Sequence, residues 1–366
     1  MNSRLDKLRK LLTKQNLDAI LVSDLQNITY LSNFSGFTTE DRDAYLLITK
    51  NKQYIFTHHI YREVAEKDFR SFDLIEIKRE NPMSVMLKNI IEKEKITTLG
   101  FEAFDLKVND FQNLTKYIDK KILISSNIVR ELRIIKDHEE INAIKKACEL
   151  GDKTFNFIID QIKLGITEIE LAVEIEYFIK RHNADISFSP IVAFGKSASQ
   201  PHHVPDNTTL KKNSFVLFDF GTRLQNYCSD MTRTIFYGKP NKEQTKLYHA
   251  VLNAQLSSQD YIKNALLQKR SIPAPTVDQV GRDYIITQGY VPFNHSSHGI
   301  GLNVHESPRL YPSSNDTLTE GMVFSIEPGI YLPGKFGIRI EDIFAIENNR
   351  LIRLTKSSNE LLEVQT

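Results

Sequence analysis

The chain has little cysteine and almost no net charge, and each shortage excludes a class of protein. Cys148 and Cys228 are the two cysteines in 366 residues, so a disulfide framework is not expected and a reducing compartment is the default. The 47 basic and 46 acidic residues leave a formal net charge of +1. That balance provides no electrostatic field for nucleic acid or a membrane surface, and we predict neither as a partner.

Long hydrophobic runs are also missing. No run of apolar residues approaches the length needed to cross a bilayer. The first residues, M-N-S-R-L-D-K-L-R-K-L-L-T-K, are charged throughout and contain neither an apolar core nor a small-residue cleavage site. We therefore expect no signal peptide, and a cytoplasmic protein.

What is present is an ordinary globular composition, with 41% hydrophobic and 25% charged residues. A chain of this size is expected to form one large or two medium domains. Alternating apolar and turn signals predict an α/β domain over residues 1–126, which includes a hairpin of strands 45–48 and 53–56. Asp137 is a good helix N-cap, and the second domain is predicted over residues 127–366.

The second domain is predicted to be α+β and to repeat one theme. A helix follows Asp137, and a capping box of Thr167 with Glu170 begins the next. A strand is expected over residues 187–192, before a hairpin that carries two carboxylates. Helical spacing returns over residues 241–290, and a second such hairpin follows. Two helices and then an acidic hairpin, twice, suggest an internal pseudo-twofold repeat.

The first acidic pair is Asp219 with Asp230, in V-L-F-D-F-G-T-R-L-Q-N-Y-C-S-D-M-T-R-T. Asp219 lies within an apolar run, where an isolated carboxylate is costly unless it is paired or bound to a metal. A hairpin folded about Leu224 and Gln225 is predicted to place Asp219 opposite Asp230. Facing carboxylates roughly 5 Å apart repel each other unless a cation lies between them.

The second acidic pair is Glu327 with Glu341, which are symmetric about Gly334 in F-S-I-E-P-G-I-Y-L-P-G-K-F-G-I-R-I-E-D. His298 lies between the two hairpins in the sequence. Alone, any of these residues would be interpreted as a solvated or structural side chain. Together, four carboxylates and one imidazole suit two divalent ions, with manganese, cobalt, zinc or iron favoured over calcium because of the histidine. Two-metal sites generate a nucleophilic hydroxide between the ions.

These motifs resemble the pita-bread metallopeptidases, in particular their proline-specific branch of aminopeptidase P and Xaa-Pro dipeptidase (prolidase). The resemblance covers the whole chain. The first domain is similar to the creatinase-type N-terminal domain through L-V-S-D-L-Q-N-I-T-Y-L-S-N-F-S-G. The second carries D-F-G, Y-C-S-D-M-T-R-T, H-G-I-G-L-N-V-H-E-S-P, G-M-V-F-S-I-E-P-G-I-Y and G-I-R-I-E-D. The implied fold is an α/β creatinase-type domain followed by an α+β pita-bread catalytic domain.

The resemblance implies a role for each metal ligand. Asp219 would chelate one ion, and Asp230 and Glu341 would bridge both. His298 and Glu327 would complete the coordination. Glu327 would also act as the proton shuttle, which accepts a proton from the bridging water and gives one to the leaving proline nitrogen.

Four further residues would act around the ligands. His305 would contact the substrate and stabilise the tetrahedral oxyanion. His202, rather than the adjacent His203, would lie near the scissile bond. Arg339 would orient ligand carboxylates. Arg309 could bind the terminal carboxylate of a dipeptide or could be a solvated loop residue.

One motif departs from the family pattern. The family usually has a histidine four residues before the ligand histidine and a glycine just before the ligand. Here Asn294 and Ser297 hold those places, and the extra histidine is His295. The departure concerns substrate contacts rather than metal coordination.

The function implied is a dinuclear metal-dependent exopeptidase, with manganese preferred. It would hydrolyse Xaa-Pro bonds at the N-terminus of short peptides or in dipeptides, and the family resemblance also implies a homodimer. The competing hypothesis is a non-catalytic peptide- or protein-binding module on the same scaffold. Such modules typically lose ligands, whereas all five ligand positions are filled here.

Overall fold

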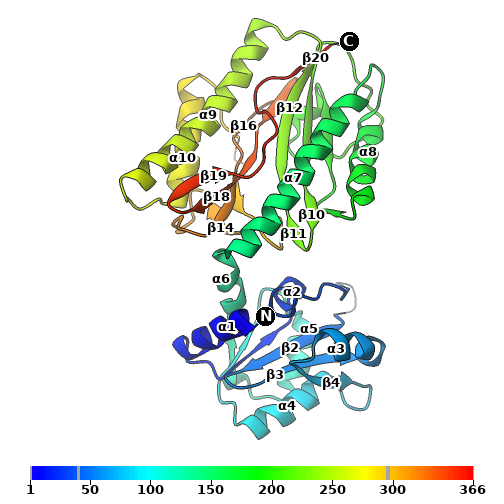
Figure 1. The fold of residues 1–366 in the computed structure, drawn as a ribbon, viewed down its shortest axis with the longest axis vertical. Helices are drawn as coiled ribbons and strands as arrows, with labels where there is room; N and C mark the ends of the chain where they lie inside the picture. The colour runs from blue at the N-terminus through cyan, green and yellow to red at the C-terminus, as the bar shows by residue number, and fades with distance from the viewer. Residues whose placement is uncertain (1, 39–41, 294–296, 366) are drawn as a thin grey trace. The chain divides into compact units, whose positions relative to one another are not determined.

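The chain folds into two compact units, Met1–Arg133 and Ile134–Thr366. Figure 1 shows them in a computed structural model that describes residues 2–38, 42–293 and 297–365. The predicted domain boundary between residues 126 and 127 lies just before helix α6 (Ile128–Ile134). Asn294 and His295, two of the three places where the motif departs from the family pattern, lie outside the described residues.

The first unit is an α/β domain built on a six-stranded sheet of order β4-β3-β2-β1-β5-β6. Strand β1 is antiparallel to β2 and parallel to β5. The predicted hairpin is confirmed as β2 paired with β3. The strands are β1 (Ala19–Val22), β2 (Ala44–Thr49), β3 (Gln53–His58), β4 (Asp73–Ile77), β5 (Leu99–Phe101) and β6 (Leu123–Ser125). The helices are α1 (Asn2–Lys14), α2 (Leu25–Ser32), α3 (Arg62–Asp68), α4 (Met83–Glu94) and α5 (Val108–Thr115).

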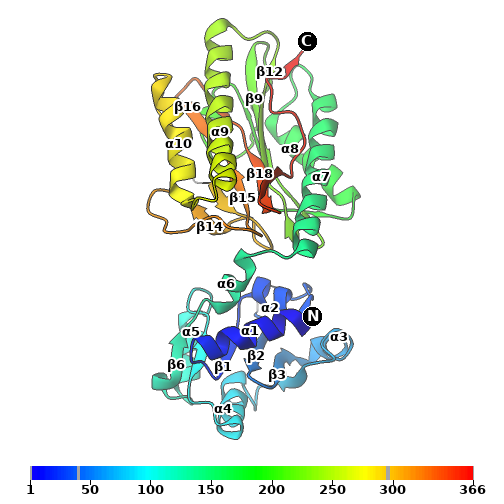
Figure 2. The ribbon, with the colours of Figure 1, turned by 60° about the vertical axis from the view of Figure 1, so that its left-hand side comes forward.

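Four long helices of the second unit come in two consecutive pairs. They are α7 (His138–Gln161), α8 (Glu168–Arg181), α9 (Lys242–Leu267) and α10 (Ala274–Thr287). The two predicted helix starts are confirmed, because Asp137 and Thr167 each form a capping box with the glutamate three residues later. Helices α9 and α10 lie side by side in Figure 2. Of the helices described, none combines the length and the apolar character needed to span a membrane.

Each helix pair is followed by strands that pair antiparallel, apart from β20, so the order of elements repeats. The first set is β7 (Asp185–Ile186), β8 (Ile191–Phe194), β9 (Ser214–Phe220), β10 (Thr222–Leu224), β11 (Tyr227–Cys228) and β12 (Met231–Tyr237). The second set is β13 (Ser297–Gly299), β14 (Glu306–Leu310), β15 (Val323–Ile326), β16 (Gly329–Leu332), β17 (Phe336–Arg339), β18 (Asp342–Glu347), β19 (Arg350–Arg353) and β20 (Glu363–Val364). The two largest sheets of the second unit have the orders β20-β12-β9-β8 and β14-β13-β15-β18-β19.

The helices pack against these strands through apolar clusters. One buried cluster joins α7 and α8 to β8, β9 and β12 through residues that include Ile158, Leu171, Val216 and Phe218. A second joins α9 to β12, β16 and β17. Because alternate residues of a strand point to opposite faces, Asp219 on β9 points away from the cluster that holds Val216 and Phe218.

The register of the first acidic hairpin differs from the prediction. Asp219 pairs with Thr232, not with Asp230. The tight turn is formed by Gln225 and Asn226, both with positive φ, at 51° and 73°. A two-residue turn of this kind matches the strand twist. The predicted centre was therefore one residue too early, and Asp230 lies in the bend just before β12.

The second hairpin has the predicted register. Gly329 pairs with Arg339, and Ile326 pairs with Asp342. These two pairs flank Glu327 and Glu341 on either side, so the same register brings the two glutamates face to face. Gly334 has φ of 72° at the turn, which a glycine adopts without steric cost.

The strand predicted over residues 187–192 is mostly wrong. The observed strand β8 begins at Ile191 and ends at Phe194. Pro190 has no backbone N–H to donate to a neighbouring strand. The preceding residues therefore leave the sheet, and Phe188 and Pro190 line a cavity instead.

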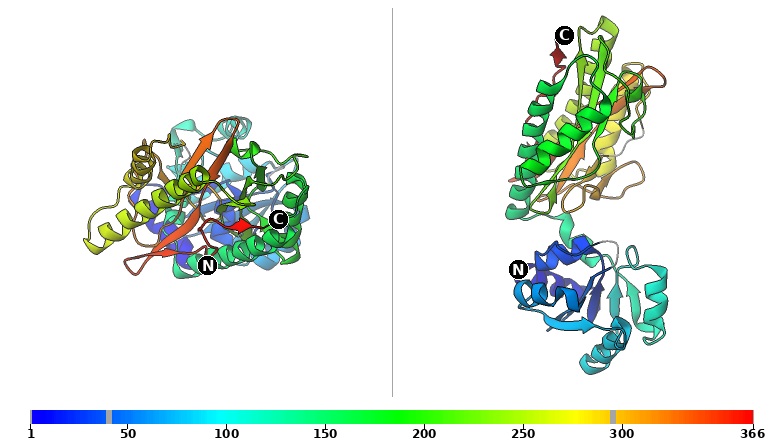
Figure 3. Two further views of the ribbon diagram at one scale, coloured as in Figure 1. Left: turned by 90° about the horizontal axis from the view of Figure 1, so that it is seen from above. Right: turned by 90° about the vertical axis from the view of Figure 1, so that its right-hand side faces the viewer.

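The C-terminal segment returns along β12, where β20 pairs with it in parallel (Figure 3). Arg233 joins this segment to the rest of the unit. Its guanidinium donates to the carbonyl oxygens of Ser357 and Ser358, and to Asp342 Oδ1 at 2.6 Å. It also donates to the carbonyl oxygen of Glu341 at 2.6 Å. The last strand is therefore connected to the backbone of a predicted metal ligand.

Candidate metal and catalytic site

A cavity of about 320 Å³ opens where the two acidic hairpins meet. Its apolar lining residues are Phe188, Pro190, Ile191, Val204 and Pro205. Eight histidine, aspartate and glutamate residues also line it, namely His202, His203, Asp219, Asp230, His298, His305, Glu327 and Glu341. All five predicted metal ligands therefore line one cavity.

The four carboxylates come from both halves of the repeat. Asp219 lies on β9, Asp230 precedes β12, Glu327 follows β15, and Glu341 precedes β18. None is more than 8% exposed. Ligand atoms of Asp219, Asp230 and Glu341 lie within 4.8 Å of one another, and so do those of His298, Glu327 and Glu341. Two groups of three that share Glu341 fit two neighbouring cations.

His298 is held in the orientation of a ligand. Its backbone N–H donates to Ser325 Oγ at 3.0 Å. Its ring Nδ1 lies 3.1 Å from the carbonyl oxygen of Gly299. A carbonyl can only accept, so Nδ1 carries the proton and Nε2 keeps its lone pair. Nε2 faces the carboxylates, 3.3 Å from Glu327 Oε1 and 3.6 Å from Asp230 Oδ2.

Two serine hydroxyl groups hold Glu327. Ser325 Oγ donates to Glu327 Oε1 at 2.8 Å, while it accepts from the backbone of His298. Ser297 Oγ accepts from the backbone N–H of Glu327 at 3.2 Å. The serine at the position where the family usually has glycine therefore contacts the backbone of a predicted catalytic residue.

Thr232 and Arg339 hold two further predicted ligands, Glu341 and Asp219. Thr232 Oγ1 donates to Glu341 Oε2 at 2.8 Å, and its carbonyl accepts from the Glu341 backbone at 3.1 Å. Arg339 donates from Nε to Thr232 Oγ1 at 2.9 Å, and from Nη2 to Asp219 Oδ2. Tyr331 accepts from the same guanidinium. Arg339 therefore contacts one ligand directly and a second through Thr232, as the sequence predicts for an orienting residue.

Burial and mutual repulsion disfavour ionised carboxylates here. Burial raises the pKa of Glu327 to about 8. Burial, and then repulsion from Glu341, Asp219 and Glu327, raises the pKa of Asp230 well above its ordinary value. Burial and repulsion from Glu327 and Asp219 raise the pKa of Glu341 in the same direction. Bound cations would reverse these shifts by stabilising the charged forms.

Two carboxylate oxygens in this cluster have no hydrogen-bond partner among the described residues. They are Asp230 Oδ1 and Glu341 Oε1, and both are buried. A buried carboxylate oxygen is normally hydrogen-bonded or metal-bound, because its desolvation is costly. Two such oxygens beside an imidazole lone pair form a donor set that fits divalent metal ions.

The predicted substrate-contacting histidines lie at the mouth of the cavity. His202 and His305 are both exposed and line it. The ring of His305 lies edge-on to that of His298, with centroids 4.3 Å apart. His203 differs from His202, because it is buried and its Nε2 lies 2.6 Å from Glu168 Oε2. Its role as a partner of Glu168 leaves His202 as the candidate for substrate contact.

Arg309 is not among the described residues that line the cavity. It lies on β14 opposite His298, and its backbone N–H donates to Asp316 Oδ2 at 2.7 Å. Its proposed contact with a peptide carboxylate stays a prediction.

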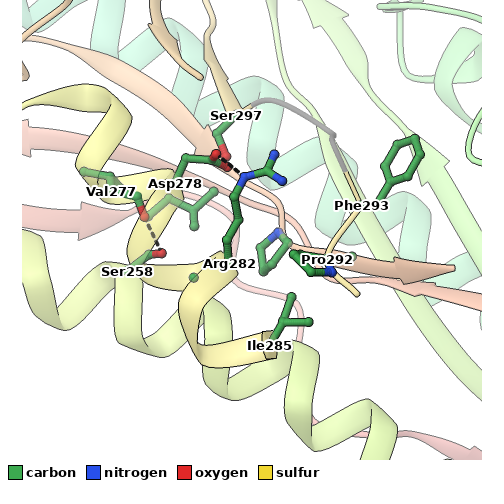
Figure 4. A pocket seen from close by; sticks show the side chains of 12 residues that line it. Ser258, Val277, Asp278, Arg282, Ile285, Pro292, Phe293 and Ser297 are labelled. Carbon is green, nitrogen blue, oxygen red and sulfur yellow. Dashed lines mark hydrogen bonds and ion pairs between the residues drawn. The ribbon is translucent and has the colours of Figure 1, made fainter. Parts of the chain in front are cut away.

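A second, much smaller cavity lies behind Glu327, where α10 approaches β13 (Figure 4). Asp278 and Arg282 form an ion pair of 2.5 Å one helical turn apart, with side chains about one-tenth exposed. Ser297 lines the same cavity. Asp278 also adds to the rise in the pKa of Glu327, so α10 contributes to the electrostatics of the site.

Comparison with known proteins decides the family. Residues 142–348 match the sequence pattern of "Metallopeptidase family M24", and residues 4–135 match that of the "Creatinase/Prolidase N-terminal domain". The chain belongs to metallopeptidase family M24. It is therefore a metallopeptidase with a creatinase-type N-terminal domain and a pita-bread domain, of a family that depends on divalent metal ions.

Named relatives in family M24 match over nearly the whole chain. The Xaa-Pro dipeptidase of Pyrococcus horikoshii is 35% identical, over 99% of both chains. The structure of an Xaa-Pro dipeptidase from Bacillus anthracis is 32% identical, with a TM-score of 0.90 and coverage of 99% of both chains. That of an X-Pro aminopeptidase from Thermotoga maritima is 29% identical, with a TM-score of 0.84, over 95% of this chain and 98% of that one.

Several residues that hold the side chains of the candidate site in place were not predicted from the sequence. Ser325 and Thr232 were not singled out, although each had a usable signal. Ser325 lies two residues before Glu327 and so shares its strand face, and Thr232 lies two residues after Asp230. Glu168 and Tyr331 had no such signal, because their partners are distant in the sequence.

Proposed function

We propose that this protein is a dinuclear metal-dependent exopeptidase that hydrolyses Xaa-Pro bonds in dipeptides or at the N-terminus of short peptides. The observation that carries the proposal is a pair of buried carboxylate oxygens beside His298, Asp230 Oδ1 and Glu341 Oε1, for which the described part of the chain offers no hydrogen-bond partner. The names of the relatives support the choice of the Xaa-Pro bond. Asp219, Asp230, His298, Glu327 and Glu341 would hold two ions, with manganese preferred.

When bound, the ions supply a water of lowered pKa as nucleophile and an electrophile for the substrate carbonyl. Glu327 carries the proton. Ser325 holds this carboxylate by donating to Oε1. The Glu327 carboxylate takes a proton from the attacking water and delivers it to the imide nitrogen, so that proline leaves as a secondary amine when the C–N bond breaks.

The histidines at the mouth would act on the substrate itself. His305 would donate to the oxyanion that forms at the scissile carbonyl, and His202 would contact the substrate beside that bond. The apolar wall that contains Phe188, Pro190 and Ile191 provides a dry surface for a ring. A proline nitrogen carries no hydrogen, so its burial leaves no donor unsatisfied there.

Hydrolysis of matched peptides tests the proposal. With manganese, we expect cleavage of Ala-Pro, Ala-Pro-Ala or both, slow cleavage of Ala-Ala, and two metal ions per chain by elemental analysis. Asp219→Ala, at the carboxylate held by Arg339, should lose metal and activity together. A metal-loaded protein that cleaves neither proline peptide would refute the proposal and favour a binding module on the same scaffold.

The hydroxyl of Ser325 provides a milder test of the same site. Ser325→Ala should lower kcat by about tenfold with little change in KM, because it removes the donor to Glu327 Oε1 and the acceptor for His298. Ser325→Thr keeps the hydroxyl and should retain activity. Ser257→Ala removes a hydroxyl that donates to the Asn253 carbonyl within α9 and serves as control. Equal activity of the two alanine variants would contradict the assignment.

We further propose a cytoplasmic homodimer, in which residues 1–126 and 127–366 act as N-terminal and catalytic domains. The shortage of cysteine supports a reducing compartment. The family resemblance supports the dimer. Sedimentation equilibrium measures the assembly, and a sole species at the 42.2 kDa mass of one chain would overturn it.

A further inference from the structure

Lys136 has a buried ammonium group in the segment between α6 and α7. Its side chain is 1% exposed, and Nζ lies 2.8 Å from Glu306 Oε1. Nζ also donates to the carbonyl oxygen of Ile134 at 3.4 Å, and the backbone N–H of Lys136 donates to Gly321 at 2.8 Å. A buried lysine charge needs a counter-charge nearby, and Glu306 supplies it.

Glu306 directly follows His305 in the chain and begins β14. Its carboxylate lies against Gly301, where a Cβ atom would collide with it. The segment from Gly301 to His305 therefore folds over the carboxylate that Lys136 holds. A glycine here lets the Glu306 carboxylate approach the backbone closely.

The other end of this segment is held separately. The carbonyl oxygen of Gly301 accepts from the backbone of Cys228, and that of Leu302 accepts from Arg223, both at 2.8 Å. His305 lies at the end of this segment that adjoins Glu306. It is exposed in the cavity, with its ring against that of His298. The Lys136–Glu306 pair is thus the anchor next to His305.

We propose that Lys136 is a positioning residue for catalysis, which acts through Glu306 to place the His305 imidazole against the metal-binding cluster. The inference rests on the proposed function, because it takes His305 to be the residue that contacts the substrate. A misplacement of about 1 Å at such a residue can lower the rate about 100-fold. A purely structural pair would instead affect stability alone.

Removing the charge of Lys136 alone, and then the charges of both Lys136 and Glu306, separates a positioning role in catalysis from a purely structural role. Lys136→Met removes the ammonium group that pairs with the Glu306 carboxylate, so it should lower both the unfolding temperature and kcat/KM, the latter by about 100-fold. The double variant Lys136→Met with Glu306→Gln removes both charges and should restore the unfolding temperature. Its kcat/KM should stay at least about tenfold low. Recovery of both properties in the double variant would overturn the proposal.

A double-mutant cycle shows whether the effect passes through His305. In a His305→Ala background, Lys136→Met with Glu306→Gln should lower kcat/KM by less than about threefold further. An undiminished loss in that background would overturn the proposal. Ile179→Val, a buried change on α8, is the control, because it removes core contacts without touching either anchor and should leave kcat/KM unchanged.

A structural measurement keeps this test separate from that of the proposed function. If the wild-type protein cleaves no proline peptide, the proposed function fails, but the position of His305 can still be compared. Crystal structures of the manganese-loaded wild type and double variant should show the His305 ring displaced by about 1 Å or more. An unmoved ring would overturn the inference, whatever the substrate.

Discussion

Glu327→Gln should abolish hydrolysis, with kcat lower by about 10³–10⁴-fold. Glutamine keeps the size of the side chain and can still accept from Ser325 through its carbonyl oxygen. However, its amide nitrogen cannot take a proton from the attacking water or return one to the leaving nitrogen. Single-turnover kinetics on Ala-Pro in saturating manganese measures the chemical step directly.

The control for this variant lies on the same hairpin. Glu347→Gln, at the end of β18 and bonded to His138, changes the same functional group away from the cavity and should retain full activity. Metal content must be measured for both, because Glu327 is also a predicted ligand. A Glu327→Gln protein that keeps more than about a tenth of wild-type kcat would contradict the proton-shuttle assignment.

Removal of divalent metal should both stop hydrolysis and change how stability depends on pH. In the chelated protein the folded-state pKa of Glu327 is about 8, against 4.5 ordinarily, and those of Asp230 and Glu341 are also raised. A carboxyl group with a raised pKa stabilises the fold fully below its unfolded pKa, and this contribution is lost as the pH rises through the folded pKa.

The free energy of unfolding of the chelated protein should therefore fall between about pH 4.5 and pH 8. Each such group would contribute up to about 1.4 kcal/mol per pH unit within its window. Manganese should remove this fall, because bound cations stabilise the ionised carboxylates. Urea unfolding at pH 5 and pH 8, with manganese or with EDTA, measures the effect.

The expected pattern is a large stabilisation by manganese at pH 8 and a small one at pH 5. Asp219→Ala, which should bind metal poorly, is the control and should respond little to manganese at either pH. An equal stabilisation of the wild type at both values would show that the buried carboxylates are not what the metal neutralises.

Much of the fold could be predicted from local sequence signals. Asp137 and Thr167 marked helix starts because their side chains cap the first turn in a way that depends only on nearby residues. The second acidic hairpin was placed in the correct register because Gly334 lies at the centre of an evident turn. The first hairpin was shifted because Gln225 and Asn226 adopt positive φ without a glycine to indicate it.

The sequence indicated which residues form the candidate site, but it did not indicate the residues that hold them in place. Each acid alone would pass for a solvated or structural side chain, but two mirror-placed pairs within apolar strands, together with His298, stand out in the sequence. By contrast, Lys136 meets Glu306 across about half the chain, and Arg339 meets Pro201 in the same way. Such contacts arise from packing between the two halves of the repeat, and no local pattern in the sequence reports them.

The C-terminal strand has a practical consequence for handling the protein. Because β20 pairs with β12, and the preceding residues bond to the arginine that also contacts the Glu341 carbonyl, an affinity tag fused after Thr366 would be expected to disturb the backbone of a predicted metal ligand. Purification handles are better attached at the opposite terminus, and trimming the final strand should weaken cation retention before it unfolds the domain.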